Sequence, residues 1–236
     1  MTKEELIIHL KELDLNLTDH QLEQIDKFCL FLLEENKKYN LTAIRKYEDV
    51  LLKHVYDSLT IVKAMNLSIQ KNLLDIGSGA GFPGIIIKIV FPHLEVTLLD
   101  SNGKKTRFLE QAKELLDLEG LEVVTARAED YIKNSRNKFE IVTARAVAHL
   151  RILTELAVPF LKQNEYFVAM KGKLNNEIEE SADTISLLNA HIENVTEFTL
   201  PIENSHRNII VIKKIAETPE IYPRSNDQIQ KKPLLK

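Results

Sequence analysis

The sequence predicts an α/β fold in which helices cover both faces of a mostly parallel, seven-stranded β-sheet. From residue 73 onward, short apolar runs alternate with helical patterns, and each interval is long enough for a crossover helix. The first run ends in a turn with alternating glycines, and an apolar helical pattern follows at once. The last two runs have no helix between them, so they should form an antiparallel hairpin at the edge of the sheet.

Residues 1–66 precede this alternation and should form an N-terminal helical cap. Two capping-box patterns, Thr2-x-x-Glu5 and Thr18-x-x-Gln21, open apolar periodic runs, the second of which continues to about residue 38. A further helical run is expected over residues 49–63. The single cysteine, Cys29, lies among apolar residues at helical spacing, which favours a buried core residue over a nucleophile.

The sheet region should span residues 67–216, and residues 217–236 should be a loosely structured basic tail. Parallel strands are predicted at 73–76, 96–100, 122–126, 139–144 and 165–170. Helices are predicted at 83–91, 104–117, 128–134, 149–161 and 174–189, and the hairpin strands near 194–200 and 209–215.

The glycine-rich turn after the first strand is the strongest sign of a ligand. Glycines allow positive φ angles and close approach to bare backbone, and the following helix start offers free N–H groups. Two nucleotide-type patterns overlap here. Residues 79–84 satisfy the G-x-G-x-x-G dinucleotide pattern, whereas Asp75-x-Gly77-x-Gly79-x-Gly81 resembles the first motif of Rossmann-like methyltransferases that use S-adenosylmethionine. Asp100 ends the second strand about 20 residues further on, where either ligand has its ribose hydroxyls.

The other strand ends supply further candidates, because ligands of open α/β sheets bind outside the carboxyl ends of the strands. Glu129, beside Ala128, could accept a hydrogen bond from an adenine amino group, or it could be an acid that the helix dipole favours at a helix start. Arg145 after the fourth strand could contact a cofactor or acceptor, or it could form a surface ion pair.

Several patterns are absent from the sequence. There is no G-x-x-x-x-G-K-[ST] motif and no histidine or cysteine spacing typical of a metal site, so we expect neither a P-loop nor a metal. No cysteine follows a strand, which argues against base methylation through a thiolate adduct. If a nucleobase is methylated, the natural acceptor is an unprotonated ring nitrogen such as guanine N7, which needs no general base.

Composition and charge complete the expectations. No apolar run approaches the ~20 residues of a membrane span and no leader pattern opens the chain, so we expect a cytoplasmic protein. The chain has a net charge of −4, yet residues 207–236 carry seven Lys or Arg and three Asp or Glu. A basic tail indicates a polyanionic partner only weakly, since a solvated terminus explains it as well.

Blocks across nearly the whole chain resemble the family of ribosomal small-subunit RNA guanine-N7 methyltransferases, formerly called glucose-inhibited division protein B. The most specific block is Asp-Ile-Gly-Ser-Gly-Ala-Gly-Phe-Pro-Gly at 75–84. The others are Asn40-Leu41-Thr42, His54-x-x-Asp57-Ser58-Leu59, Leu98-Leu99-Asp100-Ser101, Arg127-Ala128-Glu129, Ala144-Arg145-Ala146, Arg207-Asn208-Ile209 and Tyr222-Pro223-Arg224. Asn208 stands where the family often has histidine.

The resemblance implies a Rossmann-like class I methyltransferase fold and transfer of a methyl group from S-adenosylmethionine to one guanine N7. The implied partner is 16S ribosomal RNA or the small ribosomal subunit, and we expect a monomer. By motif position the cofactor would be bordered by Gly77, Ser78, Gly79, Phe82, Asp100, Ala128, Glu129 and Arg145. Arg145 is the one residue with a possible direct part in catalysis. The candidates for RNA contact are Asn40, Lys171, Arg207 and Arg224.

Two other functions fit the same patterns. A nicotinamide-dependent reductase could use the nested G-x-G-x-x-G turn, and it would bind nicotinamide rather than S-adenosylmethionine. A noncatalytic ribosome-assembly module could retain the cofactor fold, and it would bind ribosomal particles without leaving a methyl group.

Overall fold

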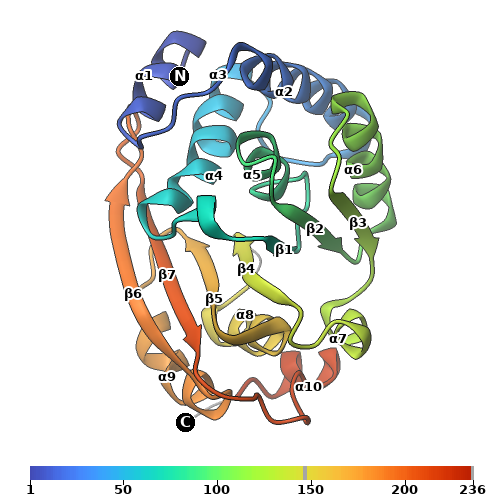
Figure 1. The fold of residues 1–236 in the computed structure, drawn as a ribbon, viewed down its shortest axis with the longest axis vertical. Coiled ribbons are helices and arrows are strands. Elements are labelled where there is room, and N and C mark those ends of the chain that lie inside the picture. The colour runs from blue at the N-terminus through green and yellow to red at the C-terminus, as the bar shows by residue number, and fades with distance from the viewer. Residues whose placement is uncertain (146–147, 235–236) are drawn as a thin grey trace.

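A seven-stranded sheet forms the centre of the computed structural model, which describes residues 1–145 and 148–234 (Figure 1). The strand order is β3-β2-β1-β4-β5-β7-β6. The first five strands pair in parallel and β7 runs antiparallel to both β5 and β6, so the predicted sheet with its edge hairpin is confirmed. The strands are β1 (Asn72–Ile76), β2 (Glu95–Asp100), β3 (Leu121–Thr125), β4 (Phe139–Arg145), β5 (Leu161–Lys171), β6 (Ala190–Thr199) and β7 (His206–Lys214).

Helices follow the parallel strands close to the predicted positions. They are α5 (Gly84–Val90), α6 (Gly103–Leu116), α7 (Ala128–Tyr131), α8 (Leu150–Ala157) and α9 (Glu177–Leu187). Short 3₁₀ turns, Ile132–Asn134 and Val158–Phe160, extend α7 and α8, which accounts for the longer helices expected there. Ala146, the last residue of one family block, lies outside the described residues, as does Lys236.

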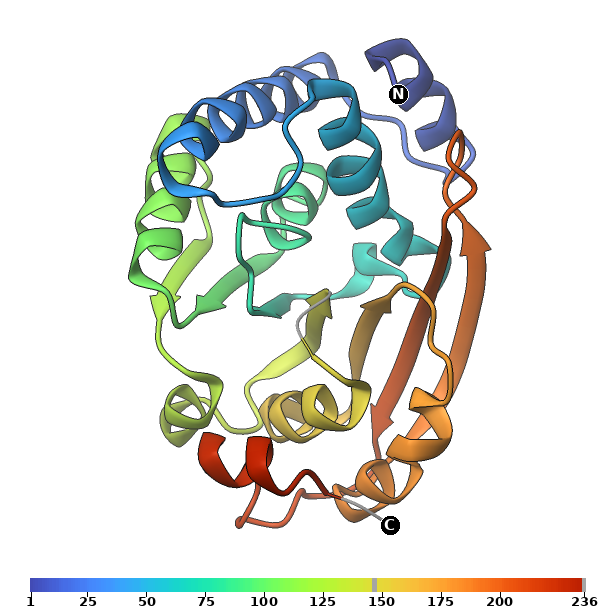
Figure 2. The same ribbon diagram turned by 180° about the vertical axis from the view of Figure 1, so that it is seen from behind.

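Two apolar cores lie on the two faces of the sheet, because successive strand residues point to opposite sides. Leu73 belongs to the core that includes α5, α6 and the N-terminal helices. Its neighbour Leu74 belongs to the core under α8 and α9. Figures 1 and 2 show the two layers of helices on either side of the sheet.

The N-terminal helices begin where the capping boxes predict. The hydroxyls of Thr2 and Thr18 accept the backbone N–H groups three residues later, at the starts of α1 (Lys3–Lys11) and α2 (Asp19–Tyr39). The ring of Phe28, fully buried on α2, lies 5.2 Å from the ring of Phe82 in the glycine-rich segment. Cys29 beside it is buried, as expected, and burial raises the pKa of its thiol to about 12.

The helical run predicted over residues 49–63 is one helical segment whose winding changes along its length. It consists of α3 (Tyr47–Val50), a π-helical part over Leu51–Tyr56, α4 (Asp57–Leu59) and a 3₁₀ turn, Thr60–Lys63. Irregular windings of this kind often accompany functional sites. Here the segment carries His54 and Asp57, which both reach the end of β4.

The expectation of a loosely structured tail is wrong. Residues 217–234 fold against the α8–α9 face, bury Tyr222 and Ile229, and include α10 (Asn226–Lys231) (Figure 2). The Arg136 guanidinium donates to the carbonyls of Thr218 and Tyr222. The sequence hides this arrangement because the partners of the tail lie some 70–90 residues away along the chain.

Candidate active site

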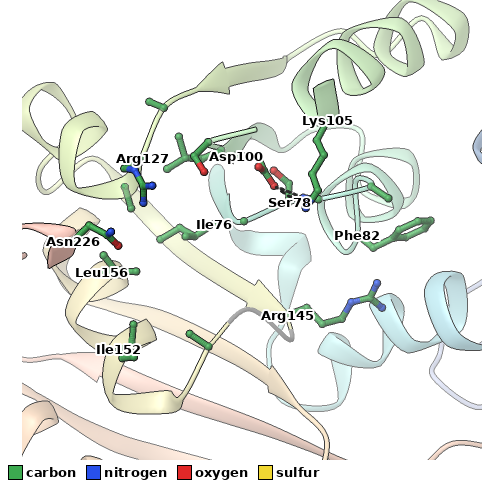
Figure 3. Close-up of a pocket in the computed structure, with 18 of the residues that line it drawn as sticks. Ile76, Ser78, Phe82, Asp100, Lys105, Arg127, Arg145, Ile152, Leu156 and Asn226 are labelled. Carbon is green, nitrogen blue, oxygen red and sulfur yellow. Dashed lines mark hydrogen bonds and ion pairs between the residues drawn. The ribbon is translucent and has the colours of Figure 1, made fainter. Parts of the chain in front are cut away.

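A cavity of about 550 Å³ lies at the carboxyl ends of the parallel strands (Figure 3). It brings together all eight residues that the sequence suggested for a cofactor, although they come from four separate stretches of the chain. These are Gly77, Ser78, Gly79, Phe82, Asp100, Ala128, Glu129 and Arg145.

The glycine-rich turn forms one wall of this cavity. The backbone N–H groups of Gly77 and Ser78 donate to the Leu99 carbonyl at 2.7 and 3.2 Å, which holds the turn against β2. Gly79 has φ of +57°, a conformation that L side chains rarely adopt. A Cβ there would meet only the Gly77 carbonyl, at 3.7 Å. The backbone at Gly79 is therefore open towards the cavity.

Asp75, the acid of the glycine motif, lies beneath the turn and does not line the cavity. Its Oδ2 accepts the backbone N–H of Gly84 at 2.9 Å, and its Oδ1 has no hydrogen-bond partner among the described residues. Complete burial raises the pKa of this carboxyl to about 7. A Cβ on Gly84 would lie 2.8 Å from Oδ2, so helix α5 can begin this close to β1 only with glycine. Asp75 thus supports the turn from below.

Asp100 at the end of β2 ties this strand to the glycine turn. Its Oδ2 accepts the backbone N–H of Gly79 at 2.9 Å, and its Oδ1 accepts that of Asn102 at 2.8 Å. Lys105 Nζ lies 3.9 Å from Oδ2 and completes this corner of the cavity. The carboxylate is held in place by three neighbours while it still borders the cavity.

Arg145 leaves the end of β4 and turns towards Phe82 (Figure 3). Its guanidinium donates to Asp57 Oδ2 at 3.3 Å and to the Lys53 carbonyl at 3.2 Å, and it lies 5.5 Å from the centre of the Phe82 ring. Burial lowers the pKa of this guanidinium, and the Asp57 carboxylate opposes that shift. Arg145 thus forms an ion pair, which was one of the two alternatives that the sequence left open. The pair is buried, however, and Arg145 also borders the cavity.

His54 connects Arg145 to the cap. Its ring stacks on Phe82 with centroids 4.5 Å apart, its Nδ1 lies 3.1 Å from the Arg145 guanidinium, and its Nε2 lies 2.9 Å from the Thr42 hydroxyl. Burial, together with the nearby Arg145 charge, lowers the pKa of His54 to about 3. A neutral His54 accepts at Nδ1 and donates from Nε2, so neither nitrogen is free to act as a general base.

A second cavity of about 370 Å³ adjoins the first, and His54 and Arg145 line both. Asp57 bridges Arg145 and Arg207, whose Nε donates to Asp57 Oδ1 at 2.9 Å. The cavity is also lined by Ile44, Lys53, Thr60, Met170, Lys171, Gly172, Phe198, Asn208 and Ile209.

The four candidates for RNA contact do not form one surface. Arg207 and Lys171 line the second cavity, where Lys171 Nζ also contacts Glu177 at 2.7 Å. Arg224 lies on the opposite side of the first cavity in an ion pair with Glu155. Asn40 ends α2 in the left-handed conformation and is exposed, next to two residues that line the first cavity.

Lys214 is one of the seven basic residues of 207–236 that indicated a polyanionic partner, but its position does not suit that role. This side chain is fully buried and donates from Nζ to the Asn137 side chain and to the Leu161 carbonyl. Burial lowers the pKa of Lys214. It stabilises the end of β7 and cannot also contact RNA there.

Sequence reasoning missed part of the cavity wall. Ile152 and Leu156, four residues apart on α8, point into it, but their spacing is also that of ordinary core residues. Asn226 and Gln230 on α10 line it too, and no motif marked them.

Among the described residues, no cluster of three or more His, Cys, Asp or Glu could hold a metal. None of the described helices is long and apolar enough to cross a membrane.

Comparisons with known proteins agree with this geometry. A family model described as "rRNA small subunit methyltransferase G" matches residues 21–210. A protein of that name from Acetivibrio thermocellus is 47% identical over 227 residues, covering 93% of this chain and 91% of the relative. Another from Bacillus velezensis is 43% identical over 237 residues and covers 99% of both chains.

Solved structures of low sequence identity share the fold. A SAM-dependent methyltransferase from Aquifex aeolicus superimposes with a TM-score of 0.54 at 16% identity, covering 71% of this chain and 93% of that one. At this identity the likeness concerns the fold alone, which is Rossmann-like and of the class I methyltransferase type.

Proposed function

The chain belongs to the ribosomal RNA small subunit methyltransferase G family, and on that premise we propose that it methylates guanine N7 at one position of 16S ribosomal RNA with S-adenosylmethionine as methyl donor. The observation that carries the proposal is the first cavity, which gathers eight residues expected at such a cofactor from four separate stretches of the chain. A volume of about 550 Å³ suits a small-molecule cofactor.

The residues around the first cavity fit S-adenosylmethionine in their chemistry. Asp100 offers carboxylate oxygens to the ribose hydroxyls, and the half-buried Glu129 offers the same to the adenine amino group. The turn at Gly79 offers open backbone. The buried Ser78 hydroxyl, which has no partner among the described residues, also lines the cavity. When bound, S-adenosylmethionine supplies a methyl group on a positively charged sulfur.

The second cavity is the proposed place of the acceptor guanine. Met170 and Phe198 offer apolar surface for the faces of a base, and Asn208 offers an amide for its edge. Because His54 and Arg145 line both cavities, a base there would lie next to the cofactor. Guanine N7 has a free lone pair, so the protein has to align the two reactants rather than remove a proton.

RNA contacts beyond the acceptor base itself must select the site, since a base pocket alone cannot specify one guanine. We propose Lys171 and Arg207 as such contacts because they border the second cavity. N7 methylation needs an exposed base edge, which favours a loop or a locally opened helix over regular duplex RNA. Monomeric state and action in the cytoplasm are part of the proposal.

A transfer assay separates this function from its alternatives. Purified protein is incubated with labelled S-adenosylmethionine and either 16S RNA or small subunits from a strain that lacks the gene, and nucleosides are analysed after digestion. We expect 7-methylguanosine, and no binding of NADH in a parallel titration. NADH binding without methyl transfer would indicate the reductase, and particle binding without a methylated nucleoside would indicate the assembly module.

A further inference from the structure

The C-terminal segment, residues 217–234, forms part of the wall of the first cavity. Asn226 and Gln230, four residues apart and therefore on one face of α10, both line it. Figure 3 shows the Asn226 amide at the side of the cavity that Arg127 and Leu156 also form. A segment that sequence suggested for RNA thus reaches the site proposed for the cofactor.

Buried polar contacts hold α10 in this position. Glu155 on α8 is only 1% exposed, and its Oε1 accepts both the backbone N–H and the Nε of Arg224, at 3.0 and 2.8 Å. Its Oε2 accepts Nη2 of the same guanidinium at 2.7 Å. Arg224 also donates to the Lys232 carbonyl at 2.9 Å, so one side chain secures the residues before and after α10. Beneath the helix, Ile229 is 1% exposed.

The surroundings of Asn226 suit one part of the ligand. Ala126 and Ala128 lie after β3, and Ile152 and Leu156 face them from α8, so this end of the cavity has apolar sides. The Asn226 amide provides a donor and an acceptor at the rim. A flat apolar ring with a polar edge is the chemistry that such a slot would accept.

We propose that α10 completes the adenine subsite, with the Asn226 amide bound to the adenine edge that carries the 6-amino group and N7. This inference rests on the proposed function, because it presumes an adenosyl cofactor in the first cavity. An asparagine amide matches adenine in this manner, donating to N7 and accepting from the amino group. Hypoxanthine has a carbonyl oxygen in place of the amino group, so only one of the two hydrogen bonds can form with that base.

Calorimetry with two ligands tests the inference on the full-length protein. S-Adenosylhomocysteine and S-inosylhomocysteine are titrated into the wild type, into Asn226→Leu and into Lys231→Gln. Lys231→Gln is the control because the Lys231 side chain is exposed and does not line the cavity. The wild type and the control should prefer the adenine compound. Asn226→Leu should bind it roughly ten-fold more weakly and lose part of the preference, because both hydrogen bonds of the amide are gone whereas Glu129 can still accept from the amino group.

Hydrogen exchange supplies the second readout. S-Adenosylhomocysteine should slow exchange in peptides covering residues 222–232 of the wild type, and less so in Asn226→Leu. Unchanged affinity and unchanged base preference in a folded Asn226→Leu protein would overturn the inference while leaving the proposed function intact. If the wild type binds neither S-adenosylhomocysteine nor S-adenosylmethionine, the proposed function itself fails.

Discussion

At the scale of single residues, burial decides which groups near the site can carry charge. Desolvation disfavours the charged forms of both His54 and Asp75, lowering the pKa of His54 to about 3 and raising the pKa of Asp75 to about 7. His54 therefore contributes ring stacking on Phe82 and a hydrogen bond from Arg145 rather than proton transfer. The sequence predicted that no protein base is needed, and the two occupied nitrogens of His54 agree with that view.

The replacement Gly79→Val should abolish binding of S-adenosylmethionine while the protein still folds. The valine side chain would project into the open side of the turn, and φ of +57° is costly for a β-branched residue. Calorimetry measures the loss, with Gly103→Ala as control because a Cβ there meets nothing within 4 Å. Unchanged affinity in a folded Gly79→Val protein would remove the glycine turn from the site.

Stability should depend on pH through Asp75. The pKa of Asp75 rises on folding from an ordinary value of 3.8 to about 7. The contribution of this carboxyl to the free energy of unfolding is therefore fully present below pH 3.8 and is lost as the pH rises through 7. Asp75→Asn lacks this ionisation. The free energy of unfolding of the wild type, relative to that of the variant, should therefore fall between pH 4 and pH 7 in urea titrations. If the difference in free energy of unfolding between the two proteins stays constant over this range, burial does not raise the pKa of Asp75.

At the scale of elements, two segments distant in sequence complete a site built on the sheet. The changing winding of residues 47–63 brings His54 and Asp57 to Arg145, and α10 closes the opposite side of the first cavity. The predicted strands, crossover helices, hairpin and capping boxes follow from local patterns and are confirmed. The docking of α10 depends on Arg136 and Glu155, and sequence patterns do not reveal partners that far away.

The Arg224–Glu155 pair should stabilise the fold far more than the other ion pair of this segment. Arg224→Ala leaves a carboxylate that is 1% exposed without its partner, and breaking a buried pair costs about 3–5 kcal/mol. Lys231→Ala removes a pair whose side chains are 76% and 78% exposed, and it should cost less than about 1 kcal/mol. Urea unfolding of both variants measures the contrast, and equal losses would refute the role of Arg224 in holding α10.

At the scale of the whole molecule, some features of the cavities and of the charged residues could be predicted from the sequence and others could not. All eight residues that the sequence suggested for a cofactor line the first cavity, because glycine spacing and strand ends are local signals. The sequence could not predict that Lys214 is buried or that Arg224 is paired, since charge counts do not distinguish solvated from buried side chains. The second cavity could not be predicted from the sequence either, because its lining comes from six separated stretches of chain.

The remaining basic residues of the C-terminal region should still strengthen RNA binding. Lys213 is half-buried and Lys231 and Lys232 are exposed, so replacing all three with glutamine removes charge without opening the core. For every lysine that binds a phosphate, its replacement should reduce the slope of log affinity against log salt by roughly 0.7–0.9. Filter binding of 16S RNA at several salt concentrations measures this slope. A slope equal to that of the wild type would show that these three lysines do not bind RNA.

The most direct test of the proposed function is mass mapping of modified nucleosides in 16S RNA from cells without the gene. The account predicts that one 7-methylguanosine is lost in these cells and restored by the wild-type gene. A gene encoding Asp100→Ala, whose product is first shown to fold, should not restore it fully, because loss of the carboxylate weakens cofactor binding by roughly 1–3 kcal/mol. An unchanged set of 7-methylguanosines in the absence of the gene would contradict the account.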